Sequence, residues 1–440
     1  MPDTMHDQRR AAPAEQPERQ RRASGPPVAW HHRAVMQPDA KDLPELVREL
    51  HRQGTPWLPS GLGSRLDWGA PLRQPCTPLS LRAVSGILEH NPGDFTLTVR
   101  AGTPLTEVQQ ALARHRQWLA VDPPWGSGPG GSDAGSIGGL VARGLSGGYR
   151  HRHLGIRDQL IGLSVLRCDG VEARAGGRVV KNVAGYDLMR LFCGSWGSLG
   201  MISSVTLRTQ PIPPARRGLL VAGDLPDLAA LVAWLVGSSL TPERIDWWSA
   251  PLAAAAGLGE EPQLLIGLAS VSATSLREQA QTIGRQTGLA CHEVEAAALE
   301  ELLTHGRGQP GALASGVASP AWLLRLAVPG DRVATLLARP ELRGLAVELA
   351  AASGIGHAWS TATATIDAAR VSALRQRCQE LGGWLTVLRQ PAETQLPAWL
   401  DAPSRPLIEA VKRRFDPLEQ LAPGRLPGVA AGLAPRALPV

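Results

Sequence analysis

The sequence predicts an α+β protein with two globular parts that are built differently. In the first part, short apolar segments alternate with long loops rich in glycine, serine and proline. In the second part, strand-like and helix-like segments alternate at short spacing, which indicates a sheet with helices on one face and a doubled βαβ pattern. Residues 211–214, Pro-Ile-Pro-Pro, are expected to link the two parts.

The composition limits the classes of function. The chain has 440 residues, which suits two or three domains, and 43% of them are hydrophobic. The formal charge of +6 comes almost entirely from arginines. These arginines are scattered and not interleaved with aromatic residues, which favours a solvated surface over a nucleic-acid-binding one.

The cysteines and the N-terminus point to a cytoplasmic protein. Five cysteines lie far apart with no Cys-x-x-Cys pair, so neither an iron–sulfur cluster nor a structural zinc is expected. Residues 1–27 are rich in Pro, Gln, Arg and Ala, which predicts a disordered lead rather than a secretory signal. The sequence contains no uninterrupted apolar run of about 18 residues, so no transmembrane helix is predicted.

The expected elements of the first part follow from periodicity and turn residues. Thr103 is predicted to cap a helix that has Pro104 in its first turn. The long loop 122–135 is expected to be functional, because structureless loops of this length usually are. The predicted helices are 42–51, 103–116 and a short one from Ser136, and the predicted strands are 56–59, 96–100, 160–166, 171–175 and 201–209.

The second part gives a similar list. The predicted strands are 218–221, 263–268, 322–327, 357–362 and 384–388, and the predicted helices are 225–236, 275–287, 333–338 and 368–381. A basic amphipathic helix is predicted over 407–415.

Three glycine-rich segments, 60–69, 135–148 and 181–202, carry the functional signal. Turn conformations expose backbone N–H groups that bind anions such as phosphate, and three such segments indicate a large, elongated anionic ligand. The Walker A ending Gly-Lys-Ser/Thr is absent from the sequence. Gly61 and Gly63 begin a Gly-x-Gly pattern, but the third glycine is displaced to Gly69 and no helix follows, which argues against a Rossmann fingerprint.

These motifs resemble those of a known family. The sequence is similar to the FAD-binding flavoproteins of the vanillyl-alcohol oxidase / p-cresol methylhydroxylase type, and within them to the E subunits of glycolate oxidase (glycolate dehydrogenase), over roughly residues 30–425. The motifs are Gly61-Leu62-Gly63-Ser64, Ala101-Gly102-Thr103-Pro104-Leu105, Gly138-Gly139-Leu140-Val141-Ala142, Val180-Lys181-Asn182-Val183-Ala184-Gly185-Tyr186-Asp187 and Phe415-Asp416-Pro417.

The resemblance implies a domain plan. It places a two-subdomain FAD-binding domain at 30–212 and a ferredoxin-like cap domain at 215–400. A C-terminal segment follows at 401–426, and residues 1–29 and 427–440 are expected to be disordered.

The resemblance also implies a non-covalent FAD site. The backbone N–H groups of residues 60–65 would hold the pyrophosphate. A covalent flavin link from the first loop is not expected, because no histidine occurs in 60–69. The sequence departs from the family at Arg143-Gly144-Leu145-Ser146, where many relatives have Asn-Ala-Gly-Gly. The implied cofactor-binding residues are Ser60, Gly61, Leu62, Gly63, Ser64 and Arg65 in the first segment, Ser136, Gly138, Gly139 and Ala142 in the second, and Lys181, Asn182, Gly197, Gly200 and Ile202 in the third.

The catalytic residues stay unassigned. Catalytic relatives carry a cluster of histidines in the cap, and this sequence lacks that cluster. The segment that ends at His357 is the part of the sequence that resembles it most. Oxidation of a 2-hydroxy acid needs an arginine for the carboxylate and a base for the hydroxyl proton, and no arginine can be singled out. Lys181 and Asn182 are candidates for contacts near the flavin, with a purely structural role in their own loop as the alternative.

Three functions remain open. The resemblance implies an FAD subunit of a complex that oxidises glycolate to glyoxylate, together with a second flavoprotein and an iron–sulfur subunit, in the cytoplasm or peripheral to the inner membrane. The alternatives are a non-catalytic FAD-fold subunit that supports a catalytic partner, and a stand-alone FAD oxidoreductase of another substrate.

Overall fold

The computed structural model describes residues 34–124, 135–177, 186–307, 320–361 and 366–430. The chain begins with α1 (Leu43–Arg52) and two parallel strands, β1 (Trp57–Ser60) and β2 (Thr77–Ser80). The apolar face of α1, with Leu43, Val47 and Leu50, is buried in the core of the first part. These elements hold the first glycine loop, which follows β1 directly.

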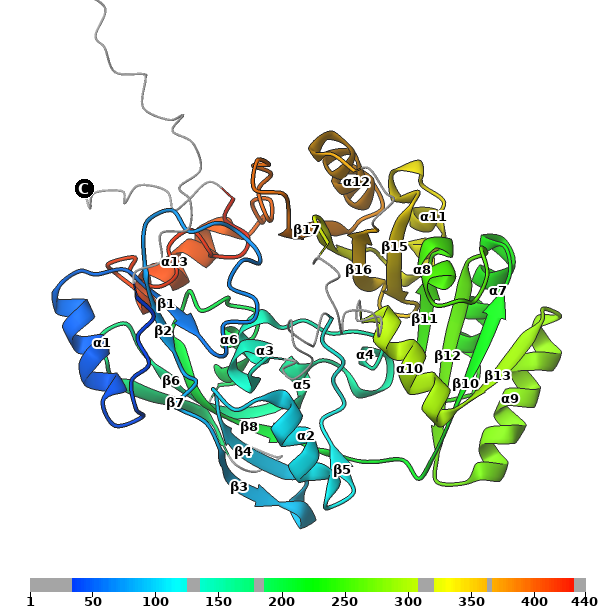
Figure 1. Cartoon of the computed structure of the whole chain (residues 1–440), viewed down its shortest axis with the longest axis horizontal. Helices are drawn as coiled ribbons and strands as arrows, with labels where there is room; N and C mark the ends of the chain where they lie inside the picture. Colours follow the sequence, from blue (N-terminus) through cyan, green and yellow to red (C-terminus); the bar gives the residue numbers. More distant parts are fainter. Residues whose placement is uncertain (1–33, 125–134, 178–185, 308–319, 362–365, 431–440) are drawn as a thin grey trace, which may run out of the picture. The chain divides into compact units, whose positions relative to one another are not determined.

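The first part is completed by a five-stranded antiparallel sheet in the order β3-β4-β8-β6-β7. Its inward side chains, among them Val99, Val165 and Val205, form one core with the helices. Figure 1 shows α2, α3 and α5 on the same side of this sheet. The bounds are β3 (Ile87–Asn91), β4 (Thr96–Arg100), β6 (Leu160–Leu166), β7 (Glu172–Gly176), β8 (Met201–Arg208), α2 (Leu105–Ala113), α3 (Ile137–Arg143), α4 (Arg150–His153), α5 (Ile156–Gln159) and α6 (Met189–Phe192).

A short ribbon, β5 (Gln117–Trp118) with β9 (Gln210–Pro211), leads to the second part. There, eight antiparallel strands form one sheet in the order β13-β10-β12-β11-β15-β16-β14-β17, which we call the cap sheet. Its strands are β10 (Ala215–Ala222), β11 (Arg244–Trp248), β12 (Gln263–Ser270), β13 (Cys291–Glu295), β14 (Leu323–Ala327), β15 (Leu345–Ala350), β16 (Ile355–Ser360) and β17 (Trp384–Arg389).

The cap sheet consists of two ferredoxin-like halves joined edge to edge. Each half has the chain order βαββαβ, first from β10 to β13 and then from β14 to β17, and the halves meet where β11 pairs with β15. The helices between the strands are α7 (Leu225–Gly237), α9 (Ala273–Thr287), α11 (Val333–Leu337) and α12 (Ala368–Glu380). All four contribute to one core on one face of the sheet, which confirms the predicted doubled pattern.

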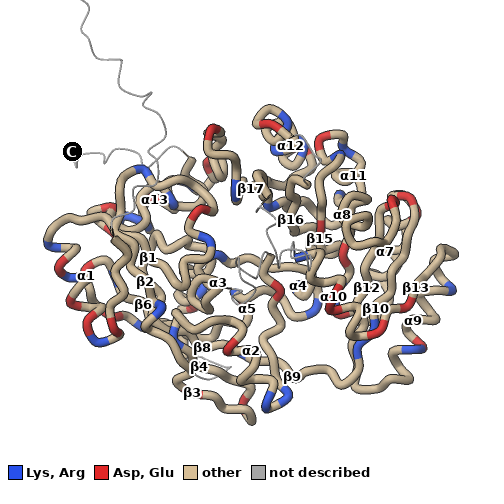
Figure 2. Tube along the Cα trace, viewed as in Figure 1, with Lys and Arg blue, Asp and Glu red and all other residues tan. Residues whose placement is uncertain are grey.

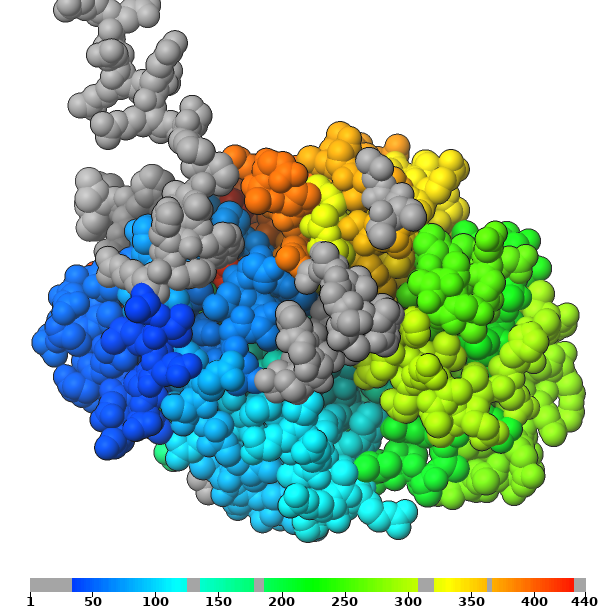
Figure 3. Space-filling model, in the orientation of Figure 1, coloured from blue at the N-terminus to red at the C-terminus, as the bar shows by residue number. Residues whose placement is uncertain are grey.

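The other face of the cap sheet has a second core. It contains residues of α8 (Ala250–Ala255) and α10 (Ala296–Gly306) together with Trp68, Leu145 and Tyr149 from the first part. The outer side of α10 is exposed and forms part of the molecular surface (Figure 3). Because this core includes residues of both parts, this face of the cap sheet packs against the first part.

The C-terminal helix α13 (Arg405–Phe415) returns to the first part. The ammonium of its buried Lys412 donates to the carbonyl oxygens of Ser198 and Leu421, at 2.8 and 2.9 Å, and to Asp416. After this helix the chain stays packed: Val429 is buried, and Ala430 N–H donates to Asp401. The expectation that disorder starts at residue 427 is therefore wrong for residues 427–430, because these contacts hold them in place.

Basic and acidic residues are mixed along the described chain. Figure 2 shows arginines and lysines interspersed with acidic residues along the trace. All five cysteines are free thiols. Over the described residues, no helix is long and apolar enough to cross a membrane, and no group of three or more His, Cys, Asp or Glu side chains is placed to hold a metal.

Candidate functional site

One cleft brings the predicted cofactor segments together. It lies between the loop after β1, the start of α3 and the loop before β8. We call it the cofactor cleft. Every predicted cofactor residue that the structure describes lines it, namely Ser60, Gly61, Leu62, Gly63, Ser64, Arg65, Ser136, Gly138, Gly139, Ala142, Gly197, Gly200 and Ile202. Lys181 and Asn182 lie outside the described residues.

The first two walls of the cleft touch through Gly61 and Ser136. A Cβ atom at position 61 would lie 1.9 Å from Oγ of Ser136, so only glycine fits there. That hydroxyl caps α3 by accepting the N–H of Gly139 at 3.2 Å. The close approach therefore fixes the start of α3 against the first glycine loop.

The two neighbouring glycines of α3 have different tasks. A Cβ at Gly138 would lie 2.6 Å from Cβ of Ala101, so Gly138 lets α3 pack on the end of β4. A Cβ at Gly139 would meet only Oγ of Ser136, at 3.3 Å. Gly138 serves packing more than cofactor access, and Gly139 is the position at which an added side chain extends into the cleft.

The loop after β1 presents donors to the cleft. Among the hydrogen bonds of the described residues, none is donated by the backbone N–H groups of Gly61, Leu62, Gly63 and Ser64. Gly63 has φ +78°, a left-handed conformation that turns the loop. Consecutive free N–H groups in such a turn form an anion-binding nest, which fits a diphosphate. The free volume at the centre of the cleft is about 80 Å³.

Three arginines line the cleft: Arg65, Arg143 and Arg425. Arg425 donates to the carbonyl oxygens of Ala70 and Leu66. Burial lowers the pKa of Arg65 and of Arg425 to about 10, and it also lowers the pKa of Arg143 well below its ordinary value. The sequence pointed to Arg65 only. Arg143 coincides with the departure from the family pattern, and Arg425 lies hundreds of residues away with no local signal.

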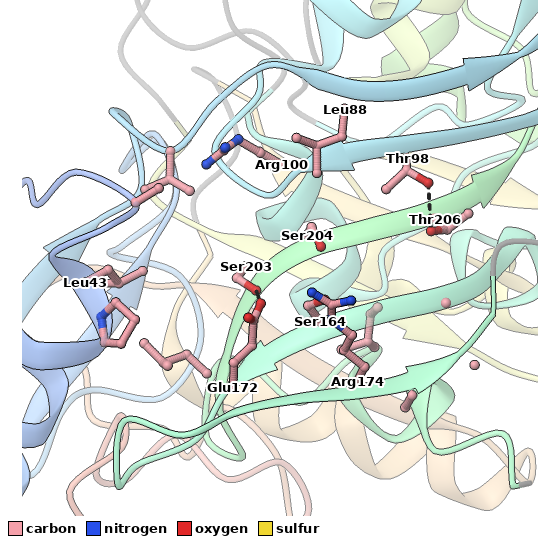
Figure 4. Close-up of a pocket in the computed structure, with 18 of the residues that line it drawn as sticks. Leu43, Leu88, Thr98, Arg100, Ser164, Glu172, Arg174, Ser203, Ser204 and Thr206 are labelled. Carbon is pink, nitrogen blue, oxygen red and sulfur yellow. Dashed lines mark hydrogen bonds between the residues drawn. The ribbon is translucent and has the colours of Figure 1, made fainter.

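A larger cavity of about 440 Å³ lies on the open face of the five-stranded sheet (Figure 4). Its polar side chains pair with one another, as in Thr98 with Thr206 at 3.0 Å and Ser203 with Glu172 at 3.3 Å. Gly177 lines this cavity and not the cofactor cleft. Tyr186, at the other described flank of the Lys181 stretch, is 87% exposed. Neither described flank of the Lys181 stretch therefore lines the cofactor cleft.

The cap sheet carries a row of polar residues on the face that shares a core with the first part. In the strand register, Glu348 of β15 lies opposite His357 of β16, and His357 lies opposite Arg325 of β14. Near the Arg325 end of the row, the first glycine loop contacts the cap sheet, because Gly69 N–H donates to the carbonyl of Leu388 on β17 at 2.7 Å. Arg389, also on β17, pairs with Asp67 at 3.2 Å.

The Arg325 end of the row is cationic, and some of its buried nitrogens lack hydrogen-bond partners among the described residues. Nε of Arg325 and Nε2 of His357 are buried and have no hydrogen-bond partner among the described residues. Burial, followed by the charge of Arg150, lowers the pKa of Arg325 to about 10. Burial, followed by the charge of Arg325, lowers the pKa of His357 to about 3, so this imidazole is neutral at physiological pH. An unpaired buried guanidinium N–H suits an anionic ligand.

The Glu348 end of the row is acidic and closed. Arg244 of β11 binds Glu348 at 3.1 Å and Asp122 at 3.2 Å, and it also pairs with Asp246. Asp122 belongs to the first part and accepts the N–H groups of Gly147 and Tyr149 at 3.0 and 3.2 Å. This buried cluster therefore joins the cap sheet to the loop after α3.

A family match over part of the chain bears on the cofactor of this cleft. Residues 33–176 match the FAD binding domain family, which indicates FAD as the cofactor. A solved structure of alkyldihydroxyacetonephosphate synthase superposes with a TM-score of 0.62 at 14% identity, over 88% of this chain and 75% of that one. This likeness shows the shared fold.

Relatives found by sequence have higher identity to the chain than this solved structure does. The chain is 36% identical over 177 residues to glycolate oxidase subunit GlcE of Escherichia coli (strain K12), covering 40% of this chain and 49% of the relative. It is 30% identical over 223 residues to glycolate oxidase subunit GlcD of Bacillus subtilis (strain 168), covering 49% of this chain and 46% of the relative. The chain thus spans about half the length of these curated relatives.

Proposed function

We propose that the chain is the FAD-binding subunit of a glycolate oxidase/dehydrogenase-type complex that oxidises a small 2-hydroxy acid, with glycolate giving glyoxylate. The observation that carries the proposal is the buried Arg325–His357 pair, which lies on the cap-sheet face that shares a core with the first part. Bound FAD would supply the two-electron acceptor for oxidation of the carbon that bears the hydroxyl group. In this proposal, residues 30–212 form the FAD-binding domain and residues 215–400 the cap domain.

The cap row offers a place for the substrate carboxylate. A guanidinium with a free buried Nε forms charge-assisted hydrogen bonds to a carboxylate. Trp384, whose ring centroid lies 5.0 Å from the guanidinium carbon of Arg325, limits how far that side chain can swing. Arg325 therefore becomes the arginine that the sequence could not single out.

His357 suits a hydrogen-bonding role. Its neutral imidazole has one donor and one acceptor nitrogen, and either can contact the substrate. With a pKa of about 3, however, it is too weak a base to hold the hydroxyl proton at neutral pH. The base is not assigned, and a partner subunit that supplies it would agree with a role inside a complex.

The names of the relatives support a role for the chain in a complex with partner subunits. The relatives carry the word subunit in their names, and we propose a second flavoprotein and an iron–sulfur subunit as partners of this chain. The second candidate function is a non-catalytic FAD-fold subunit, which is favoured because no base is assigned among the described residues.

Glycolate bleaching of the flavin tests the proposal. The purified holoprotein, alone and with its partner subunits, is mixed anaerobically with glycolate while the flavin absorbance is followed. Bleaching of the flavin of this chain, alone or in the complex, supports the proposal. If this flavin stays oxidised while the complex turns over glycolate, the chain is the non-catalytic subunit. Absence of turnover by the complex, with both flavins oxidised, would rule out glycolate as the substrate.

A further inference from the structure

Arg143 occupies an unusual position in the cofactor cleft. It is the last residue of α3, one turn beyond Gly139, and its side chain lines the cleft. Nη2 donates to the carbonyl oxygen of Arg65. The guanidinium carbon lies 4.2 Å from the ring centroid of Trp196. Two contacts thus hold the guanidinium at the cleft wall.

One nitrogen of this guanidinium lacks a partner. Nη1 of Arg143 is buried and has no hydrogen-bond partner among the described residues. A buried N–H donor without an acceptor costs about 1–3 kcal/mol, and more when it is charged. Native structures rarely keep such a group unless something else binds it.

The electrostatic surroundings make the missing partner an anion. After burial, the charges that lower the pKa of Arg143 are those of Arg425 and Arg65. Asp67 is the carboxylate that acts in the opposite direction, but its side chain is 49% exposed and already pairs with Arg389. The wall of the cleft therefore carries excess positive charge in the described part of the chain.

We propose that Nη1 of Arg143 binds a negatively charged oxygen of FAD. This oxygen belongs either to the diphosphate or to the pyrimidine side of the flavin ring, where carbonyl oxygens carry partial negative charge. Arg143 then adds a side-chain contact to the backbone nest of residues 61–64. The inference depends on FAD binding, which the family match supports, and not on the proposed substrate.

The three arginines have different roles under this proposal. Arg425 donates to two backbone carbonyls and holds the loop at Leu66 and Ala70. The guanidinium of Arg65 donates to the carbonyl oxygen of Pro124 at 3.4 Å, and the backbone carbonyl of Arg65 accepts the hydrogen bond from Arg143. Arg143 has a buried Nη1 without a partner among the described residues and a place on the cleft wall, at the end of the helix that Ser136 caps.

The chain offers a matched control. Arg216 also stacks on a tryptophan, with its guanidinium carbon 4.2 Å from the ring centroid of Trp118, but it pairs with Glu243 at 3.0 Å. FAD is removed from wild type, Arg143→Met, Arg143→Lys and Arg216→Met, and each apoprotein is titrated with FAD by fluorescence quenching. Arg143→Met is expected to bind FAD roughly 10- to 100-fold more weakly, as expected for loss of a charge-assisted hydrogen bond. Arg143→Lys is expected to recover part of the affinity, and Arg216→Met to stay within about twofold of wild type.

Thermal unfolding separates ligand binding from a structural role. Removing one cation from a positive cluster relieves repulsion, so the melting temperature of Arg143→Met apoprotein is expected to equal or exceed that of wild type. That of the FAD-loaded variant is expected to fall below wild type at equal FAD concentration. A lower melting temperature in the apoprotein as well would indicate a structural role and overturn the proposal.

Two fragments of the cofactor distinguish the two oxygens. Weaker binding of inorganic pyrophosphate to Arg143→Met, with riboflavin binding unchanged, would assign Arg143 to the diphosphate. The reverse pattern would assign it to the ring. FAD affinity within twofold of wild type for Arg143→Met would overturn the proposal.

Discussion

Oε1 of Glu348 lies 3.1 Å from Nη2 of Arg244, and both side chains are almost fully buried. The same guanidinium also serves Asp122 and Asp246, so three carboxylates share one arginine. Burial, followed by the charge of Asp246, raises the pKa of Glu348 from 4.5 to about 8. Burial likewise raises the pKa of Asp246. The cluster therefore holds a proton at neutral pH.

The first prediction is a fall in stability with rising pH. A carboxyl with a raised pKa binds its proton more tightly in the folded state, so its contribution is present at low pH. That contribution is lost as the pH rises from about 4.5, the unfolded value, through about 8. The free energy of unfolding is expected to drop by about 1–3 kcal/mol between pH 5 and 8 on this account. The measurement is urea unfolding across that range.

Glu348→Gln provides the control for this prediction. Glutamine keeps the size and hydrogen-bonding capacity of a protonated glutamate but does not titrate. The pH dependence of the variant should flatten, and at pH 8 it should be at least as stable as wild type. An unchanged slope in Glu348→Gln would show that the proton sits elsewhere, and the other groups facing the cluster are Asp122, Tyr149 and Arg307.

The second prediction concerns the buried Lys412–Asp416 pair. Asp416 also accepts the N–H groups of Gln420 and Leu421, at 3.0 and 2.8 Å, so the pair joins α13 to the chain that follows it. Lys412→Met would leave the Asp416 charge buried without a cation, at a cost of about 3–5 kcal/mol. The double variant Lys412→Met/Asp416→Asn should recover a large part of that loss in chemical denaturation. No recovery would mean that the backbone contacts of Lys412 dominate.

The third prediction tests Arg325 as the carboxylate anchor. Arg325→Met is expected to raise the glycolate concentration that half-bleaches the flavin by roughly 10- to 100-fold, because a charge-assisted hydrogen bond is lost. Arg332→Met is the control, since that side chain is 56% exposed on the same part of the chain and pairs only with the adjacent Asp331 among the described residues. An equal response of both variants to glycolate would remove Arg325 from the site.

The sequence predicted the cofactor cleft better than the cap row. Local motifs identified the cleft residues because glycine loops and the Ser136 cap act over short stretches of chain. Arg325 and His357 lie 32 residues apart and become neighbours only through the register of β14 and β16. A single sequence without pairing information carries no signal for such a contact.

Some elements were missed because buried polar residues hide their pattern. Every residue of β11 is buried, yet Arg244 and Asp246 interrupt its apolar run, and no strand was predicted there. Thr103 was expected to cap α2, but its hydroxyl donates to the carbonyl of Arg100 at 2.8 Å and accepts Gly86 N–H at 2.8 Å. The cap position belongs to Pro104, and the threonine instead fixes the turn after β4.

The cofactor cleft is tested most directly by the FAD content of two glycine variants. Gly139→Val would place a side chain in the cleft, whereas Gly284→Val adds the same side chain to a helix where nothing lies within 4 Å. Released flavin is measured by chromatography after reconstitution with excess FAD. We expect about one FAD per chain for wild type and for Gly284→Val, and almost none for a folded Gly139→Val, since its side chain would occupy cofactor space. A wild-type protein that cannot take up FAD, or a Gly139→Val protein that retains it fully, would contradict this account.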